Sequence, residues 1–350
     1  SVFRSQLEAR GTTAFGRQVK INGLIHLERS LRPRIILEDI FIANPEWATG
    51  ARFASAEKVS LQVALLPLLS GKLRILDVSL NGVDLFIEEG PDGANNYTFG
   101  DRSDSKTLGV LPPIEQLLVK DAVINHQSAN GSSLYEISEA RLQNIPGQPE
   151  IIEGKGAAKG MAFTFLFVAE TAAELSGPQN PWSVKLNING PDMSASIEGH
   201  MAEPFKLENS EYRITISAKQ TDTLETLFGV NFPMSGLFEL SAKVNTSIDS
   251  FRLTDIIAST EELQLNAQGT VARPLENNEF EFQYELMGKE IKGLRPLADF
   301  VLPLCGEFRA KGRINGRDKR FSHKGDLRIG KSDLKADITV LRERLRPKIT

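Results

Sequence analysis

Two segments have the residue pattern of β-strands, Pro33-Arg34-Ile35-Ile36-Leu37-Glu38-Asp39-Ile40-Phe41-Ile42 and the nearby run Lys58-Val59-Ser60-Leu61-Gln62-Val63. In the second run every other residue is apolar, which is the period of a strand with one apolar face. Turn residues separate such runs, as in Asn44-Pro45 and in Gly90-Pro91-Asp92-Gly93. The sequence from Pro33 to Phe99 is therefore predicted to form strands joined by tight turns, with one helical turn near Pro67.

The same segment resembles the N-terminal region of the AsmA family of bacterial envelope proteins. The resemblance rests on four motifs in matching order: Ala43-Asn44-Pro45-Glu46-Trp47, Ala56-Glu57-Lys58-Val59, Leu65-Leu66-Pro67-Leu68-Leu69-Ser70-Gly71 and Asp92-Gly93-Ala94-Asn95-Asn96-Tyr97. It departs from the family at Tyr97, where tryptophan is usual. The resemblance implies a periplasmic protein with an inner-membrane anchor upstream of Ser1.

Composition excludes several classes of protein. The 350 residues contain 41 lysines and arginines against 45 aspartates and glutamates, so a net charge of −4 offers no electrostatic footprint for nucleic acid. The single cysteine, Cys305, excludes an internal disulfide. No apolar run approaches the roughly 20 residues of a membrane-spanning helix.

Breaks in the pattern divide the chain into three parts. Residues 1–99 are predicted to form an AsmA-like β unit with a leading helix near Phe3–Phe15. Residues 100–113 read as a flexible loop, and residues 114–350 as a continuing antiparallel sheet. Within that last part, Leu224-Glu225-Thr226-Leu227 and Leu294-Arg295-Pro296-Leu297 begin two similar stretches at an offset of 294 − 224 = 70 residues. This predicts a helix-plus-strands repeat at about 222–273 and 292–341, in which each copy needs its neighbour to bury its apolar face.

No catalytic or metal-binding pattern stands out. The four histidines, His26, His126, His200 and His323, lack the close spacing of a metal site. Cys305 occupies the repeat position that Ser235 fills in the other copy, which favours a small structural side chain over a nucleophile. Nucleotide-binding and hydrolase motifs are missing from the sequence. We therefore predict a protein that is not an enzyme and that needs no cofactor or metal.

The remaining signal is an excess of strands with one apolar face and too few helices to cover it. Such strands fold into a sandwich or barrel, or stay open to an apolar ligand. The family resemblance favours the last option, because AsmA proteins resemble bridge-like lipid-transfer proteins. It implies a mainly β fold with an elongated, curved antiparallel sheet that forms an apolar groove, and a few short helices. Residues that alternate with polar or small neighbours are predicted to form the concave, lipid-binding floor of that groove: Val59, Leu61, Val63, Leu85, Ile87, Phe163, Phe165, Ile214, Ile216, Phe238, Leu240, Phe280, Phe282 and Tyr284.

The implied function is transfer of glycerophospholipids between the inner and outer membranes, which supports outer-membrane integrity, with a possible inner-membrane partner protein. The alternative is a periplasmic scaffold that assists outer-membrane protein assembly by pairing with unfolded strands. An enzyme is a third interpretation. A β-sandwich carbohydrate-binding module is a fourth, and it would require exposed aromatic platforms.

Overall fold

A computed structural model of the chain describes residues 2–28, 30–65, 74–90, 95–97, 114–128, 131–145, 147–170, 181–201, 209–228, 236–247, 249–272, 279–290, 306–317, 320–341 and 348–349. Several sequence predictions fall outside these residues, namely the helical turn near Pro67, the loop at 100–113 and the helix near 294–300. Contacts group the chain into two compact units, Ser1–Thr171 and Ala172–Thr350. The predicted boundaries at residues 99 and 113 stay predictions.

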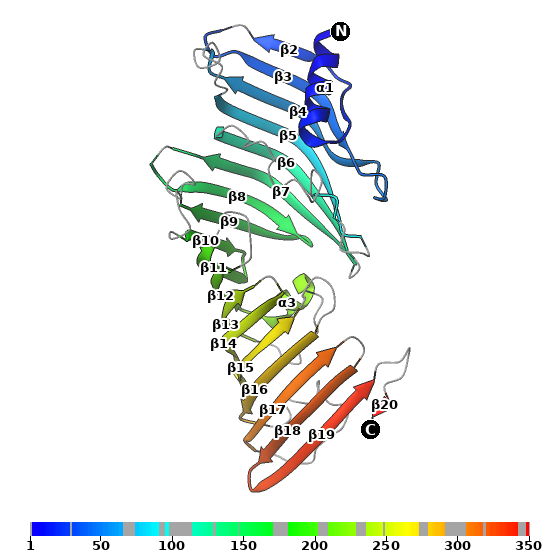
Figure 1. Ribbon diagram of the computed structural model, residues 1–350. Coiled ribbons are helices and arrows are strands. Elements are labelled where there is room, and N and C mark those ends of the chain that lie inside the picture. Colours follow the sequence, from blue (N-terminus) through cyan, green and yellow to red (C-terminus); the bar gives the residue numbers. More distant parts are fainter. Residues whose placement is uncertain are drawn as a thin grey trace. The chain divides into compact units, whose positions relative to one another are not determined.

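The described residues of unit 1 form helix α1 and a sheet whose strands lie side by side (Figure 1). Strands β1 and β2 both pair with β3, and the order then follows the chain from β3 to β9. Its elements are α1 (Val2–Phe15), β1 (Val19–Ile21), β2 (Ile25–Glu28), β3 (Arg34–Ala43), β4 (Arg52–Val63), β5 (Ile75–Glu88), β6 (Ile114–Ser128), β7 (Gly131–Gln143), β8 (Glu150–Ala158) and β9 (Met161–Ala169).

One pair in unit 1 differs from the predicted antiparallel arrangement. Strands β5 and β6 are parallel, with Ile75 beside Ile114 and Glu88 beside Gln127. Parallel neighbours need a connection of a dozen or more residues to bring the chain back to the same end. The long stretch between Glu88 and Ile114, which includes the predicted loop, supplies that length. The sequence pattern gave no information on this direction, because alternation is the same in both kinds of pair.

The described residues of unit 2 form an antiparallel meander from β10 to β20 and the short helix α3 (Figure 1). Its elements are β10 (Trp182–Asn189), β11 (Met193–Met201), β12 (Glu211–Ala218), α3 (Thr221–Phe228), β13 (Phe238–Thr246), β14 (Ser250–Thr260), β15 (Leu263–Ala272), β16 (Glu279–Gly288), β17 (Phe308–Arg317), β18 (Arg320–Ile329), β19 (Ser332–Leu341) and β20 (Lys348–Ile349). Strands β13 and β17 begin 308 − 238 = 70 residues apart, as do β14 and β18. The helix of the second predicted repeat lies outside the described residues, so the repeat stays a prediction.

Both helices that fall on described residues are confirmed. Helix α3 buries Leu224, which is 1% exposed, and contacts β12. Helix α1 buries none of its residues and instead covers β1 with polar side chains. Glu8 Oε1 accepts a hydrogen bond from the Ile21 amide at 2.9 Å, and Thr12 Oγ1 accepts one from the Val19 amide at 3.0 Å. These bonds occupy backbone donors that an unpaired strand edge would otherwise offer to another chain.

A large part of the apolar surface stays accessible. The chain exposes 23339 Å², whereas a compact protein of 38.6 kDa exposes about 14,000 Å². One buried cluster of unit 2 is small and consists of Leu263, Phe308 and Ile329, with Leu286 and Leu327 packed against it. Single-layer sheets account for this surplus, because a second layer would remove one face of each sheet from water.

A buried asparagine connects two of the motifs that carry the AsmA resemblance. Asn96 is 0% exposed. Its Nδ2 donates to Asn44 Oδ1 at 2.9 Å and to the Phe86 carbonyl at 2.7 Å, and its Oδ1 accepts from the Glu88 amide at 2.8 Å. Its own carbonyl accepts a bond from Arg17 Nη1 at 2.5 Å. Asn96 therefore joins the turn after β3 to the end of β5.

Replacing this side chain tests its structural role. Asn96→Ala removes three side-chain hydrogen bonds from a site that water does not reach, so we expect the free energy of unfolding to fall by about 2–4 kcal/mol. Equilibrium urea unfolding measures the change. Tyr97→Phe, at a neighbouring side chain that is 46% exposed, is the control and is expected to shift stability by less than about 0.5 kcal/mol. Equal stability of Asn96→Ala and the unmodified chain would contradict the role.

Candidate functional site

Unit 2 has a continuous apolar face, which we call face A2. Residues directly opposite each other in a ladder point to the same face, so the pairing defines rows that cross the strands. One row runs through β10 to β13 as Leu186, Ile197, Ile214 and Ala242. Across the register shift between β13 and β14 it continues to β19 as Ile256, Ala267, Tyr284, Gly312, Gly325 and Ala336. The next row runs as Ile188, Ala195, Ile216, Leu240, Ala258, Leu265, Leu286, Ala310, Leu327 and Leu334. Neither row contains a charged residue.

A single irregularity in β14 keeps face A2 apolar. The ladder shifts beside Ser241 and Lys243 of β13, and Asp255 of β14 has a positive φ of 50°. An extra residue of this kind forms a β-bulge and moves the side-chain alternation by one position. Residues separated by an odd number of positions face opposite sides of a regular strand, but the bulge places both Leu253 and Ile256 on face A2. Asp255 forms an ion pair with Lys243 at 2.7 Å.

Unit 1 also has an apolar face, face A1, and a line of similar irregularities crosses it. In each strand from β3 to β7, two adjacent residues without apolar side chains separate the apolar stretches, and we call these two residues a doublet. One residue of each doublet has no partner in the ladder. The doublets are Glu38-Asp39, Glu57-Lys58, Asn81-Gly82, Lys120-Asp121 and Ser138-Glu139. Asp39, Gly82 and Asp121 have positive φ values of 47°, 61° and 52°. We call this line the polar step.

Strands β8 and β9 show that apolar residues on both sides of the polar step share face A1. These two strands lack a doublet, so Phe163 and Phe165 of β9, two positions apart, point to the same face. Phe165 belongs to the row of Gly154, Ala140, Val119, Leu80 and Val59. Phe163 belongs to the row of Gly156, Ile137, Ala122, Val83 and Ala56.

The structure places each predicted floor residue on the apolar face of its own unit. On face A1, Leu61 and Val63 follow Val59 along β4, and Leu85 and Ile87 follow Val83 along β5. On face A2 the predicted residues are Ile214, Ile216, Phe238, Leu240, Phe280, Phe282 and Tyr284. Their contact with lipid and the concavity of these faces stay predictions.

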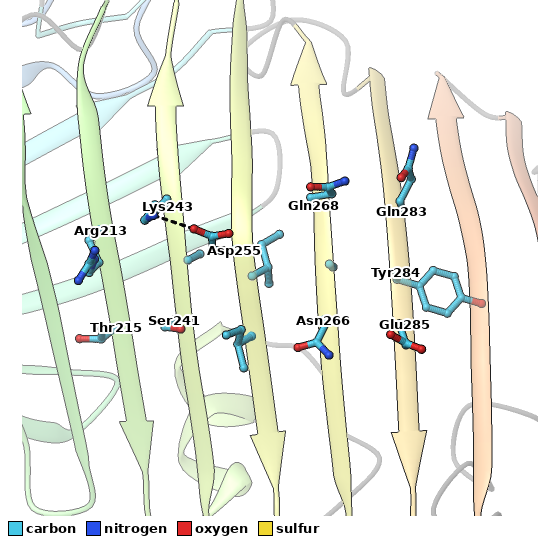
Figure 2. A pocket seen from close by; sticks show the side chains of 14 residues that line it. Arg213, Thr215, Ser241, Lys243, Asp255, Asn266, Gln268, Gln283, Tyr284 and Glu285 are labelled. Carbon is cyan, nitrogen blue, oxygen red and sulfur yellow. Dashed lines mark ion pairs between the residues drawn. The ribbon is translucent and has the colours of Figure 1, made fainter.

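The opposite face of unit 2 is polar and contains a hollow of about 760 Å³ between β12 and β16 (Figure 2). Arg213, Thr215, Gln268 and Gln283 are among the side chains that line it. A twisted sheet is saddle-shaped, so a hollow on one face does not decide the curvature of the other. At the β16 side of the hollow, hydrogen bonds from Arg309 and Lys311 hold the pKa of Glu285, which also lines it, below its usual value.

Glycines on the apolar faces lie opposite aromatic residues. A methyl group at Gly316 would lie 2.4 Å from Phe280 Cε1, and one at Gly269 would lie 2.4 Å from Phe282 Cδ1. The same relation holds for Gly154 with Phe165, Gly199 with Tyr212 and Gly288 with Phe308. Each ring therefore lies over the glycine of the neighbouring strand and does not project away from the sheet. The apolar surface is smoother as a result.

The histidines are dispersed among the described residues. His126 Nε2 lies 3.5 Å from Glu89 Oε1, His200 Nδ1 lies 3.1 Å from the Ser183 hydroxyl, and His323 Nε2 lies 2.7 Å from the Tyr284 hydroxyl. His26 lies on β2. Within the described ranges, no group of three or more histidine, cysteine or carboxylate side chains has the geometry to hold a metal ion.

These features define a class of mainly β proteins whose open sheets each present an apolar face. The AsmA family model matches residues 2–186, which is more than half of the chain, and the protein belongs to the AsmA family. Members of this family are envelope proteins and are not known as enzymes. Neither a curated protein nor a solved structure matches the chain. No helix in the described part of the chain is long and apolar enough to cross a membrane.

Sequence reasoning missed the polar step and the glycine–aromatic pairs. The step leaves a signal, since two adjacent residues without apolar side chains interrupt an otherwise regular alternation in five consecutive strands, β3 to β7. The glycine–aromatic pairs leave none in a single strand, because the partner of a glycine is known only once the register is known.

A double-mutant cycle tests the glycine–aromatic packing. We expect Gly316→Ala to lower the free energy of unfolding by about 1–3 kcal/mol, because the added methyl group forces the Phe280 ring to move. In a Phe280→Leu background the same change should cost at least about 0.5 kcal/mol less, because the smaller side chain leaves room. Urea unfolding of the four proteins gives the coupling energy. Purely additive effects would contradict the packing described here.

Proposed function

We propose that this protein transfers glycerophospholipids between the inner and outer membranes and thereby supports outer-membrane integrity. The observation that carries the proposal is the pair of rows on face A2 that contain no charged residue from β10 to β19. An acyl chain on these rows exchanges water for hydrocarbon contact, which stabilises it by roughly 0.8 kcal/mol for each buried methylene. Because successive rows offer similar contacts, a lipid can move along the face without crossing a deep energy minimum.

The charge distribution supports the same proposal. The cross-strand ion pairs between β16 and β17, Glu281 with Arg313 at 3.3 Å and Glu285 with Lys311 at 3.1 Å, lie on the polar face. The rows of face A2 hold no charge that a hydrocarbon chain would have to desolvate. A phosphate head group would remain at the margin of the face, in contact with water. We place the protein in the periplasm, with both membranes and an inner-membrane protein as its partners.

The alternative, a scaffold for outer-membrane protein assembly, requires free strand edges. Side chains of α1 occupy the edge of β1 at Val19 and Ile21, which leaves less backbone for another strand to pair with at this position.

A charge placed on the rows separates the two functions. Leu240→Asp puts a carboxylate on face A2, where its contact with hydrocarbon costs several kcal/mol. We expect the full-length protein with this change to be produced normally and to fail to correct the outer-membrane permeability defect of a strain that lacks the protein. A scaffold that uses backbone pairing would tolerate the change.

The matched control is Ser241→Asp, which adds the same carboxylate to the next residue of the same strand, on the polar face. We expect this variant to correct the defect. Full correction by a folded Leu240→Asp protein would contradict lipid movement along face A2. Native mass spectrometry of the purified protein provides a second test, with co-purified phospholipid as the expected result.

A further inference from the structure

Two polar side chains interrupt the apolar rows of face A2 at one place. Tyr284 of β16 and His323 of β18 reach towards each other across β17, and the Tyr284 hydroxyl lies 2.7 Å from His323 Nε2. Figure 2 shows the Tyr284 ring extending towards β17. The two ring centroids are 5.9 Å apart, and both side chains are half-buried. Burial raises the pKa of Tyr284, which keeps its hydroxyl protonated as a hydrogen-bond donor.

Glycines beneath the pair allow both rings to lie low on the sheet. Gly312 pairs with Tyr284 on one side and with Gly325 on the other. A methyl group at Gly312 would lie 3.1 Å from Tyr284 Cε1 and 3.1 Å from His323 Nε2, and one at Gly325 would lie 3.1 Å from His323 Nε2. The polar atoms are therefore held near the level of the surrounding apolar side chains, where a lipid on the face would meet them.

Counting donors shows what the pair can bind. A neutral histidine has one donor and one acceptor nitrogen, and a tyrosine hydroxyl has one proton to donate. If the hydroxyl donates to Nε2, the N–H at Nδ1 remains; if Nε2–H donates to the hydroxyl oxygen, the phenolic proton remains. In both tautomers one donor is left after the internal bond is made.

The face around the pair offers little to satisfy that donor. The neighbouring positions on face A2 are Phe282 and Leu286 on β16, Ala310 and Ile314 on β17, Phe321 and Leu327 on β18, and Ala336 and Ile338 on β19. All of these side chains are apolar. A donor among apolar groups gains from a ligand that brings an acceptor into hydrocarbon surroundings.

We propose that Tyr284 and His323 form a binding site for the ester carbonyl of an acyl lipid, which sets the position of the lipid on face A2. An ester carbonyl is an uncharged acceptor at the end of a hydrocarbon chain, and it matches a neutral donor at the level of an apolar floor. This inference rests on the proposed function and adds to it a preference for ester-linked over ether-linked chains.

The test compares two lipids that differ only in this group. The full-length protein is titrated with a fluorescent diacyl phosphatidylethanolamine and with its dialkyl ether analogue of the same chain length. We expect the ester lipid to bind about fivefold more tightly, the effect of one hydrogen bond. Tyr284→Phe and, separately, His323→Phe should reduce this ratio towards one while binding of the ether lipid is retained.

The control is Tyr212→Phe, which removes a hydroxyl from the same face. The Tyr212 side chain is buried and its hydroxyl is shielded from solvent, so this variant should keep the ester preference. Equal binding of both lipids by the unmodified protein would overturn the ester site and leave the proposed function standing. Binding of neither lipid would overturn both. An ester preference that survives in the Tyr284 and His323 variants would overturn the assignment to this pair.

Discussion

The structure depends on the rule that residues opposite each other in a β ladder share a face. In a single-layer sheet no second layer corrects an error, so the register alone decides whether a row is apolar. A slip by one residue would move every apolar side chain of a strand to the other face. The polar step of unit 1 and the bulge at Asp255 in unit 2 are two places where the chain adds a residue and still keeps this rule. At each of these irregularities the alternation of apolar and polar residues in the sequence shifts by one position. The apolar side chains before and after the irregularity therefore stay on the same face.

The ion pairs on the polar face of unit 2 contribute to strand pairing. Pairs such as Lys243 with Asp255 and Arg313 with Glu281 join neighbouring strands in exposed positions, where each contributes at most about 1 kcal/mol. They favour the correct partner of a strand more than they stabilise the fold. Buried polar groups such as the Asn96 amide contribute more, because a donor left unpaired away from water carries the full cost of desolvation. A few buried hydrogen bonds thus contribute most to stability, and many weak exposed ion pairs contribute to the register of the strands.

Period-two alternation indicates which side chains share a face only within an uninterrupted stretch of strand, because its phase changes at the polar step and at Asp255. Val59, Phe165, Leu240 and Phe282 were selected from their own strands alone, and each lies on the apolar face of its unit. The parallel pairing of β5 with β6 was not predictable, because it depends on where a long connection returns. The hydrogen bonds of Asn96 were also hidden, since residues as distant as Asn44 and Asn96 meet only after the strands between them have paired. The pattern of apolar and polar residues along a strand indicates which side chains share a face, whereas the pairing of segments distant in sequence decides which strands are neighbours.

The pairing of glycines with aromatic rings links the fold to the proposed movement of lipid. Upright rings would divide an apolar face into separate pits, and each pit would hold an acyl chain in a local energy minimum. Rings that lie across Gly154, Gly269 and Gly316 keep the contacts more even from row to row. Under the proposed function, such a face would bind hydrocarbon with similar strength along its rows, so a single stronger contact would have a large influence on where a lipid rests. The Tyr284–His323 pair would be that contact, because it offers a hydrogen bond among side chains that are otherwise apolar.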